Sequence, residues 1–359
     1  MENSKRLTYI DLLESIAIFF VLLYHSRLYA TDFLSDSSIS NYISYFSTTI
    51  LSTCVPLFFF ANGYLLFSKP FVLKKHIFKI IRIIVLTFVW AILLITSYML
   101  ISDTPISIKE MILHILNLDT DWNMDIFWYL GALICIYILF PLLKIAFDSN
   151  KKVFVFFTVA CAILTFGFVL VNEILCFVGV VSHHSISINF PAITMFNPFR
   201  GSYGYSFVYF CAGGLMYFYK DKILSISKLK RNLFSIIGIF LSCICLFLVG
   251  ILYSKSQGKL WDAVWYGYDT IFTFMNTIFI FILCLNYKKD NKFIRTISCN
   301  TLGIYFIHSL FIRLTKPYIK TVDLFCNIPM NLLYSFAILC VSLAVILIIR
   351  KIPLLKKLV

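Results

Sequence analysis

Long apolar runs follow one another along almost the whole chain. The first, residues 10–28, is already long enough to cross a bilayer, because about 20 helical residues at about 1.5 Å each match a hydrocarbon core of about 30 Å. Of the 359 residues, 60% are hydrophobic and 13% are charged. No soluble domain of this size needs so much apolar surface. The sequence therefore predicts an all-α, polytopic membrane protein.

About ten apolar windows are predicted to form transmembrane helices. They are residues 9–28, 43–67, 77–101, 126–147, 153–173, 203–219, 233–253, 263–287, 298–315 and 329–349. The longest connections, around residues 102–125 and 174–202, are too short for a separate soluble domain. We therefore expect residues 1–359 to form one transmembrane domain.

The basic residues indicate the topology. When the 31 Lys and Arg residues are assigned to alternate sides of the ten windows, 23 fall on the side of the termini and 8 on the other. By the positive-inside rule, both termini are predicted to be cytoplasmic. The net charge of +14 is then mainly a topology signal and an attraction to anionic lipid, and it does not indicate nucleic-acid binding.

A polar stripe runs along the first predicted span. At about 100° per residue, Asp11, Glu14 and His25 point to one side of a helix, with Glu14 and His25 roughly 16 Å apart along its axis. Ionisable side chains inside a membrane are costly and usually functional, and imidazole titrates nearest to neutral pH. We therefore expect this stripe to face a protein cavity and to contain catalytic residues. The alternative is a histidine with a structural role.

The second predicted span contains Pro56 and the pair Asn62-Gly63 among aromatic residues. This composition predicts a broken helix, which a membrane protein tolerates only where the backbone lines a cavity or is buried in protein. The alternative is a simple kink.

Lys75, Lys79 and Arg82 recur at i, i+4 and i+7 at the start of the third predicted span, and so form one cationic face. Beside a helix N-terminus, this face suits a phosphorylated ligand that arrives from the cytosol. Ordinary positive-inside charge is the alternative interpretation.

Three further residues are candidates for substrate binding. Trp128 and Tyr129 begin the fourth predicted span near the expected outer face, where aromatic rings either stack on sugars or form an interfacial belt. His308 lies within the ninth span and is either a cavity residue or a packing residue. The 11 cysteines form no recognisable ligand set, and neither they nor His183-His184 predict a metal site.

Taken in order, these segments resemble motifs of the acyltransferase family 3 membrane proteins, which are O-acyltransferases of bacterial surface glycans. The similar segments are Asp11 to His25, Pro56 to Tyr64, Lys74 to Arg82, Ile126 to Pro141, Tyr209 to Tyr217 and Leu302 to His308. The resemblance extends from about residue 6 to residue 350. One departure bears on the chemistry, since Glu14 stands where the family carries an arginine on the donor side of the site. The donor-binding role would then pass to Lys75, Lys79 and Arg82, unless the chain is an inactive homologue.

The resemblance implies a multi-pass protein of the bacterial plasma membrane. It would transfer an acetyl or short acyl group from cytosolic acetyl-CoA to a hydroxyl of a surface or capsular polysaccharide or its lipid-linked precursor. His25 would act as general base or carry the acyl group transiently, and Asp11 would orient its partners. Asn62 and the backbone N–H groups released by the broken helix would stabilise the developing oxyanion. Acetyl-CoA would be a substrate, with no bound cofactor. A glycan transporter or exporter without acyl chemistry is the rival hypothesis, because internal carboxylates and broken helices also suit transporters.

Overall fold

The computed structural model describes residues 6–28, 31–102, 106–117, 124–182, 203–320, 327–353 and 355–358. Every regular element in these ranges is helical, which confirms the predicted fold class. The α-helices are α1 (Thr8–Ser26), α2 (Ile39–Leu51), α3 (Cys54–Phe67), α4 (Leu73–Ser102), α5 (Ile108–Asn117), α6 (Trp128–Ser149), α7 (Lys151–Ala162), α8 (Phe168–Ser182), α10 (Gly204–Leu224), α11 (Lys228–Gln257), α12 (Ile271–Cys284), α13 (Lys292–Ser298), α14 (Thr301–Thr315) and α15 (Ile328–Lys351). A π-helical turn, Ile163–Gly167, joins α7 to α8.

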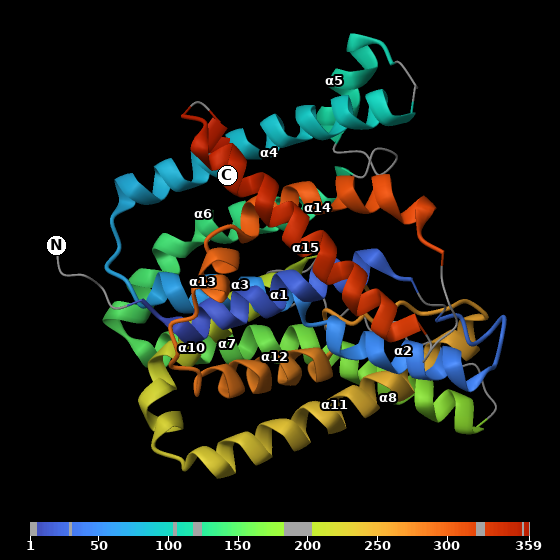
Figure 1. Cartoon of the computed structure of the whole chain (residues 1–359). Coiled ribbons are helices and arrows are strands. Elements are labelled where there is room, and N and C mark those ends of the chain that lie inside the picture. The colour runs from blue at the N-terminus through green and yellow to red at the C-terminus, as the bar shows by residue number, and fades with distance from the viewer. Residues whose placement is uncertain are drawn as a thin grey trace.

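Helix α1 runs through the middle of the bundle, with α4 and α11 on opposite outer sides (Figure 1). It packs against α3, α12, α13, α14 and α15. Its first turn lies at the end of the bundle where α4 begins and α15 ends (Figure 1). We call this the basic end, because α4 starts there with Lys74-Lys75 and α15 finishes with Arg350-Lys351. His25 is in the last turn of α1 and so lies toward the opposite end.

Seven helical segments of the described chain are long and apolar enough to cross a membrane, fewer than the ten predicted windows. The pair α13 and α14 would form an eighth span, bent by 79° at the break between them. The window 263–287 contains only the 14-residue helix α12, because residues 263–269 form turns. The window 203–219 does form a helix, α10, which is not among the seven.

The predicted break inside the second span is in the wrong place. Helix α3 continues without interruption from Cys54 to Phe67, and the chain breaks earlier, at Ser52-Thr53 between α2 and α3. Pro56 is the third residue of α3, where an N–H group has no partner within the helix and the proline ring is tolerated. Of the two sequence signals for a break, Pro56 therefore lies in the first turn of α3, and Asn62-Gly63 lies within the continuous helix.

Gly63 has a packing role instead. A Cβ atom on Gly63 would lie 1.8 Å from the carbonyl oxygen of Phe210, and one on Gly213 would lie 2.1 Å from that of Phe60. Helices α3 and α10 therefore cross with their backbones in direct contact, as small residues allow between membrane helices. This crossing fixes the position of Asn62, the neighbour of Gly63.

Candidate active site

Two adjoining cavities lie against α1. The first, of about 290 Å³, is lined by His25 together with Tyr24, Arg27, Cys54, Ile126, Trp128, Trp265 and Tyr268. The second, of about 360 Å³, is lined by Glu14, Asn62, Lys79, Arg82 and Arg350 among mostly apolar residues. We call them the histidine cavity and the cationic cavity. Val21, Val55, Tyr129 and Tyr305 line both and form the wall between them.

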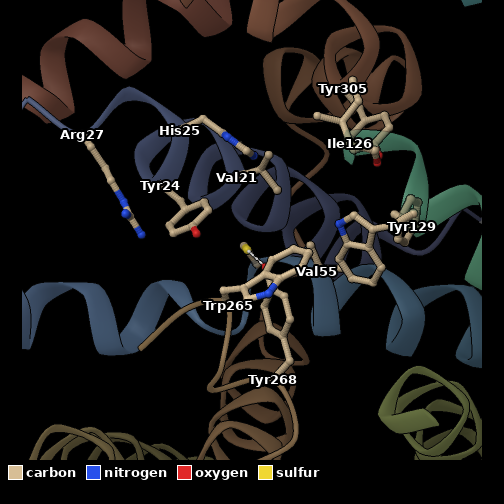
Figure 2. Close-up of a pocket in the computed structure, with 12 residues that line it drawn as sticks. Val21, Tyr24, His25, Arg27, Val55, Ile126, Tyr129, Trp265, Tyr268 and Tyr305 are labelled. Atoms are coloured by element: carbon tan, nitrogen blue, oxygen red, sulfur yellow. Dashed lines mark hydrogen bonds between the residues drawn. The ribbon is translucent and has the colours of Figure 1, made fainter. Parts of the chain in front are cut away.

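His25 is exposed within the histidine cavity, although it belongs to an apolar helix. Figure 2 shows Val21, Tyr24 and His25 projecting from α1, with Trp265 and Tyr268 on the far side of the cavity. The imidazole therefore faces a space bordered by aromatic rings, where a substrate hydroxyl could approach it. This placement agrees with the expectation that the polar side of α1 faces a cavity.

His308 lies behind His25, with the two ring centroids 5.2 Å apart. It is fully buried and is not among the residues that line either cavity. Its Nδ1 atom is 2.6 Å from the carbonyl oxygen of Tyr305. Since a carbonyl only accepts, Nδ1 carries the hydrogen, and in the neutral imidazole Nε2 then carries a lone pair. In the described part of the chain Nε2 has no hydrogen-bond partner.

An ion pair fixes the end of α1 that carries His25. Arg27 donates to Asp262 over 2.6 Å, and the Tyr24 hydroxyl donates to the same carboxylate oxygen over 3.0 Å. The other oxygen of Asp262 accepts from the backbone N–H groups of Val264 and Trp265. Asp262 therefore fixes the position of Trp265 relative to the end of α1 that carries His25. Sequence analysis missed Asp262, because nothing in the sequence pairs two residues that are 235 positions apart.

The cationic cavity gathers basic side chains from two helices. Lys79 and Arg82 of α4 line it, whereas Lys75, predicted to share their face, is not among its lining residues. The Lys79 ammonium lies 4.6 Å from the centre of the Tyr137 ring. Arg350 of α15 also lines the cavity and donates to the carbonyl oxygen of Cys299 over 3.0 Å. Sequence analysis did not single out Arg350 as a candidate site residue.

The predicted polar stripe is divided between three environments. Glu14 lines the cationic cavity and His25 the histidine cavity. Asp11 is buried and receives two hydrogen bonds of 2.7 Å from Arg6. The Ser298 hydroxyl lies between the carboxylates, 2.8 Å from Asp11 and 2.6 Å from Glu14. Asp11 therefore anchors the start of α1 to α13.

Asn62 lines the cationic cavity, and both ends of its amide are engaged. The Tyr137 hydroxyl donates to its oxygen over 2.8 Å, and its nitrogen contacts the Phe58 carbonyl at 3.0 Å and the Tyr129 hydroxyl oxygen at 3.5 Å. Because α3 is a regular helix here, the released backbone N–H groups expected for an oxyanion site do not exist around Asn62. Asn62 contacts the wall residue Tyr129 and does not reach the histidine cavity.

Trp128 and Tyr129 begin α6, close to the predicted start of the fourth span, and both line the histidine cavity. The Trp128 ring stacks on Tyr203 at 4.8 Å and meets Trp265 nearly edge-on at 5.6 Å. The Tyr305 hydroxyl donates to the carbonyl oxygen of Ile126. His183-His184 lies outside the described residues.

Comparison with known proteins supplies the family. The model of an acyltransferase domain, that of acyltransferase family 3, matches residues 7–351. A search of the curated proteins finds no significant match to the chain, and a search of the solved structures finds none. The matched range contains both cavities and every residue that lines them. The chain therefore belongs to the acyltransferase 3 family of membrane proteins.

Proposed function

We propose that this acyltransferase moves an acetyl or short acyl group from cytosolic acetyl-CoA to a hydroxyl of a surface glycan or its lipid-linked precursor. The observation that carries the proposal is the pair of adjoining cavities. One presents cations, the other presents His25, and four residues form their common wall. A thioester that reaches this wall from the cationic side would meet an acceptor hydroxyl on the histidine side.

The donor would bind from the basic end, which the positive-inside rule makes cytoplasmic in a bacterial plasma membrane. Lys79, Arg82 and Arg350 supply charged donors for the phosphates of CoA. Glu14 cannot serve this purpose, although it replaces the arginine found in the family. The cations of α4 and α15 around it would take over the donor-binding role.

His25 would act as the general base. The acceptor oxygen attacks the thioester carbonyl carbon while His25 removes the hydroxyl proton, and the carbon–sulfur bond then breaks. The CoA sulfur leaves as a thiolate and takes up that proton, so that charge and atoms balance. Tyr129 borders both cavities, and its hydroxyl would donate to the developing oxyanion. Asn62 would orient the Tyr129 hydroxyl, and His308 would hold the His25 ring through its unused Nε2 atom.

The proposal is tested by NMR of surface polysaccharide from cells that carry the wild-type chain, a deletion, or His25→Ala at equal expression. We expect acetyl signals only with the wild-type chain. Polysaccharide that is lost or shortened in the deletion, with the acetylation of the remaining polymer unchanged, would refute acyl transfer and identify a transporter.

We expect Lys79→Gln to raise the KM for acetyl-CoA by about tenfold or more, because a hydrogen bond to a charged group contributes roughly 1.5–3 kcal/mol. The kcat should change little if Lys79 binds the donor equally strongly in the ground state and in the transition state. Initial rates in isolated membranes at varied acetyl-CoA concentration measure both constants.

Lys75→Gln is the matched control, since Lys75 lies one turn earlier on α4 and is not among the residues that line the cavity. It should leave the KM near the wild-type value. Equal effects of the two substitutions would mean that general surface charge, and not the cationic cavity, attracts the donor.

A further inference from the structure

A third cavity, of about 470 Å³, lies beside the histidine cavity. Six Trp and Tyr residues line it, namely Tyr203, Tyr205, Tyr253, Trp261, Trp265 and Tyr266. Two carboxylates also line it, Glu173 from α8 and Asp269 from the turn before α12. We call this space the acidic cavity. The mechanism proposed above uses neither of these carboxylates.

Glu173 is the unusual member of the acidic cavity. Its exposed fraction is 4%, and within the described ranges neither of its carboxylate oxygens has a hydrogen-bond partner. Burying a carboxylate without a partner is costly, and an unpaired buried polar group calls for an explanation. None of the described residues that line this cavity is a lysine or an arginine, although the chain as a whole carries 31 of them. A ligand with a positive charge would relieve this cost.

The aromatic residues limit what such a ligand can be. Tyr253 and Trp261 lie with their rings stacked, 5.7 Å between centroids, and Trp261 is 6.2 Å from Tyr266. The faces of aromatic rings carry negative charge density, so they attract both cations and the polarised C–H groups on the face of a sugar ring. Aromatic faces together with two carboxylates therefore match a polyhydroxylated ring that carries an ammonium group.

The acidic cavity adjoins the site of chemistry. Trp265 lines both the acidic and the histidine cavity. Trp128 of the histidine cavity stacks on Tyr203 of the acidic cavity. A chain of linked sugars with one residue in the acidic cavity would therefore extend along these rings toward His25.

We propose that the acidic cavity binds a sugar residue of the acceptor that carries a free, protonated amino group. The inference rests on the proposed function for the identification of the acceptor as a glycan. Glu173 and Asp269 accept hydrogen bonds from the ammonium and neutralise its charge. The neighbouring sugar then presents its hydroxyl to His25, so the acidic cavity selects the acceptor without taking part in acyl transfer.

Calorimetric titration of the full chain in lipid nanodiscs, without acetyl-CoA, tests this inference. The probes are a tetrasaccharide of β-linked glucosamine and its fully N-acetylated counterpart, which lacks the charge. We expect the wild-type chain to bind the amine form at least about tenfold more tightly, as a charge-assisted contact predicts. Equal affinities for the two probes would overturn the inference.

Two substitutions locate the preference. Glu173→Gln and Asp269→Asn keep the size of each side chain and remove its charge, and each should reduce the preference for the amine form. Glu110→Gln is the matched control, because Glu110 is an exposed carboxylate on α5, and it should leave the preference intact. If one of these two variants does not fold, the other one tests the inference. A folded variant that still binds the amine probe as selectively as the wild-type chain would refute the assignment of the acidic cavity.

The same preparation separates this inference from the proposed function. If the protein prefers the amine probe but transfers no acetyl group from acetyl-CoA, the proposed transferase function is refuted and the assignment of the acidic cavity stands. A chain that transfers acetyl groups but binds both probes equally would refute the assignment of the acidic cavity alone.

Discussion

His25→Ala is expected to lower the rate of acyl transfer by about 10²- to 10⁴-fold, the usual contribution of a general base. His25 is the one imidazole among the described residues that line the histidine cavity. Because its side chain is exposed to that cavity, its removal leaves no new void in the core, and the amount of folded protein should not change. Rates with radiolabelled acetyl-CoA, normalised to protein in the membrane, measure the effect.

His114→Ala serves as the control, because His114 lies on α5 and lines none of the three cavities described above. It should keep the wild-type rate. A His25→Ala protein with full activity would remove the general base from the mechanism, and the acceptor hydroxyl would then need another proton acceptor.

His308→Asn separates positioning from chemistry. This substitution removes the Nε2 lone pair that lies beside the His25 ring. We expect a smaller loss than for His25→Ala, roughly tenfold, because His25 remains but its ring is less well held. Activity measured across pH should keep the shape of the wild-type profile, since the titrating base is unchanged. A loss as large as that of His25→Ala would give His308 a direct part in the reaction.

The first span illustrates what local sequence can predict. Helical periodicity placed Asp11, Glu14 and His25 on one side of α1, and the structure does bring Glu14 and His25 to cavities. Periodicity describes directions around one helix only, so it could not foresee that the wall at Val21 divides the stripe between two cavities. Nor could it foresee that Arg6 and Ser298 would bind Asp11.

Residues contributed by distant parts of the chain were harder to find. Asp262 and Arg350 enter the site through contacts with segments far away in sequence, which a single sequence does not encode as a pattern. Glu173 did carry a local signal, since it is a carboxylate within the apolar run 168–182 and such residues are rarely without function. Glu173 belongs to no recognisable motif, so this signal alone does not assign it to a site.

The Asn62-Gly63 pair predicts a helix break, because glycine and asparagine weaken helices in water. In a membrane protein, glycine also permits the closest approach of two helices. This second property explains the glycine at position 63. Gly63 and Gly213 face each other's helix at the crossing of α3 and α10. The expected oxyanion site around a broken backbone is therefore replaced by a rigid crossing that supports Asn62 and, through it, Tyr129.

Gly63→Ala is expected to destabilise the protein by at least about 3 kcal/mol, a large part of the 5–15 kcal/mol typical of a folded domain. The added Cβ atom would lie 1.8 Å from a backbone oxygen of α10, which cannot move aside as a flexible side chain can. The two helices would have to separate, and the packing along their crossing would be lost. Thermal unfolding in detergent, followed by the loss of monodisperse protein, should show a much lower midpoint or no folded protein.

Gly131→Ala gives this experiment its control. Gly131 is also within a helix, α6, but a Cβ atom there would meet nothing within 4 Å. Because alanine is the better helix former by roughly 0.5–1 kcal/mol, this variant should unfold at or slightly above the wild-type temperature. A Gly63→Ala protein as stable as Gly131→Ala would mean that α3 and α10 do not cross in backbone contact. The support for Asn62 and Tyr129 at the common wall would then have to come from elsewhere.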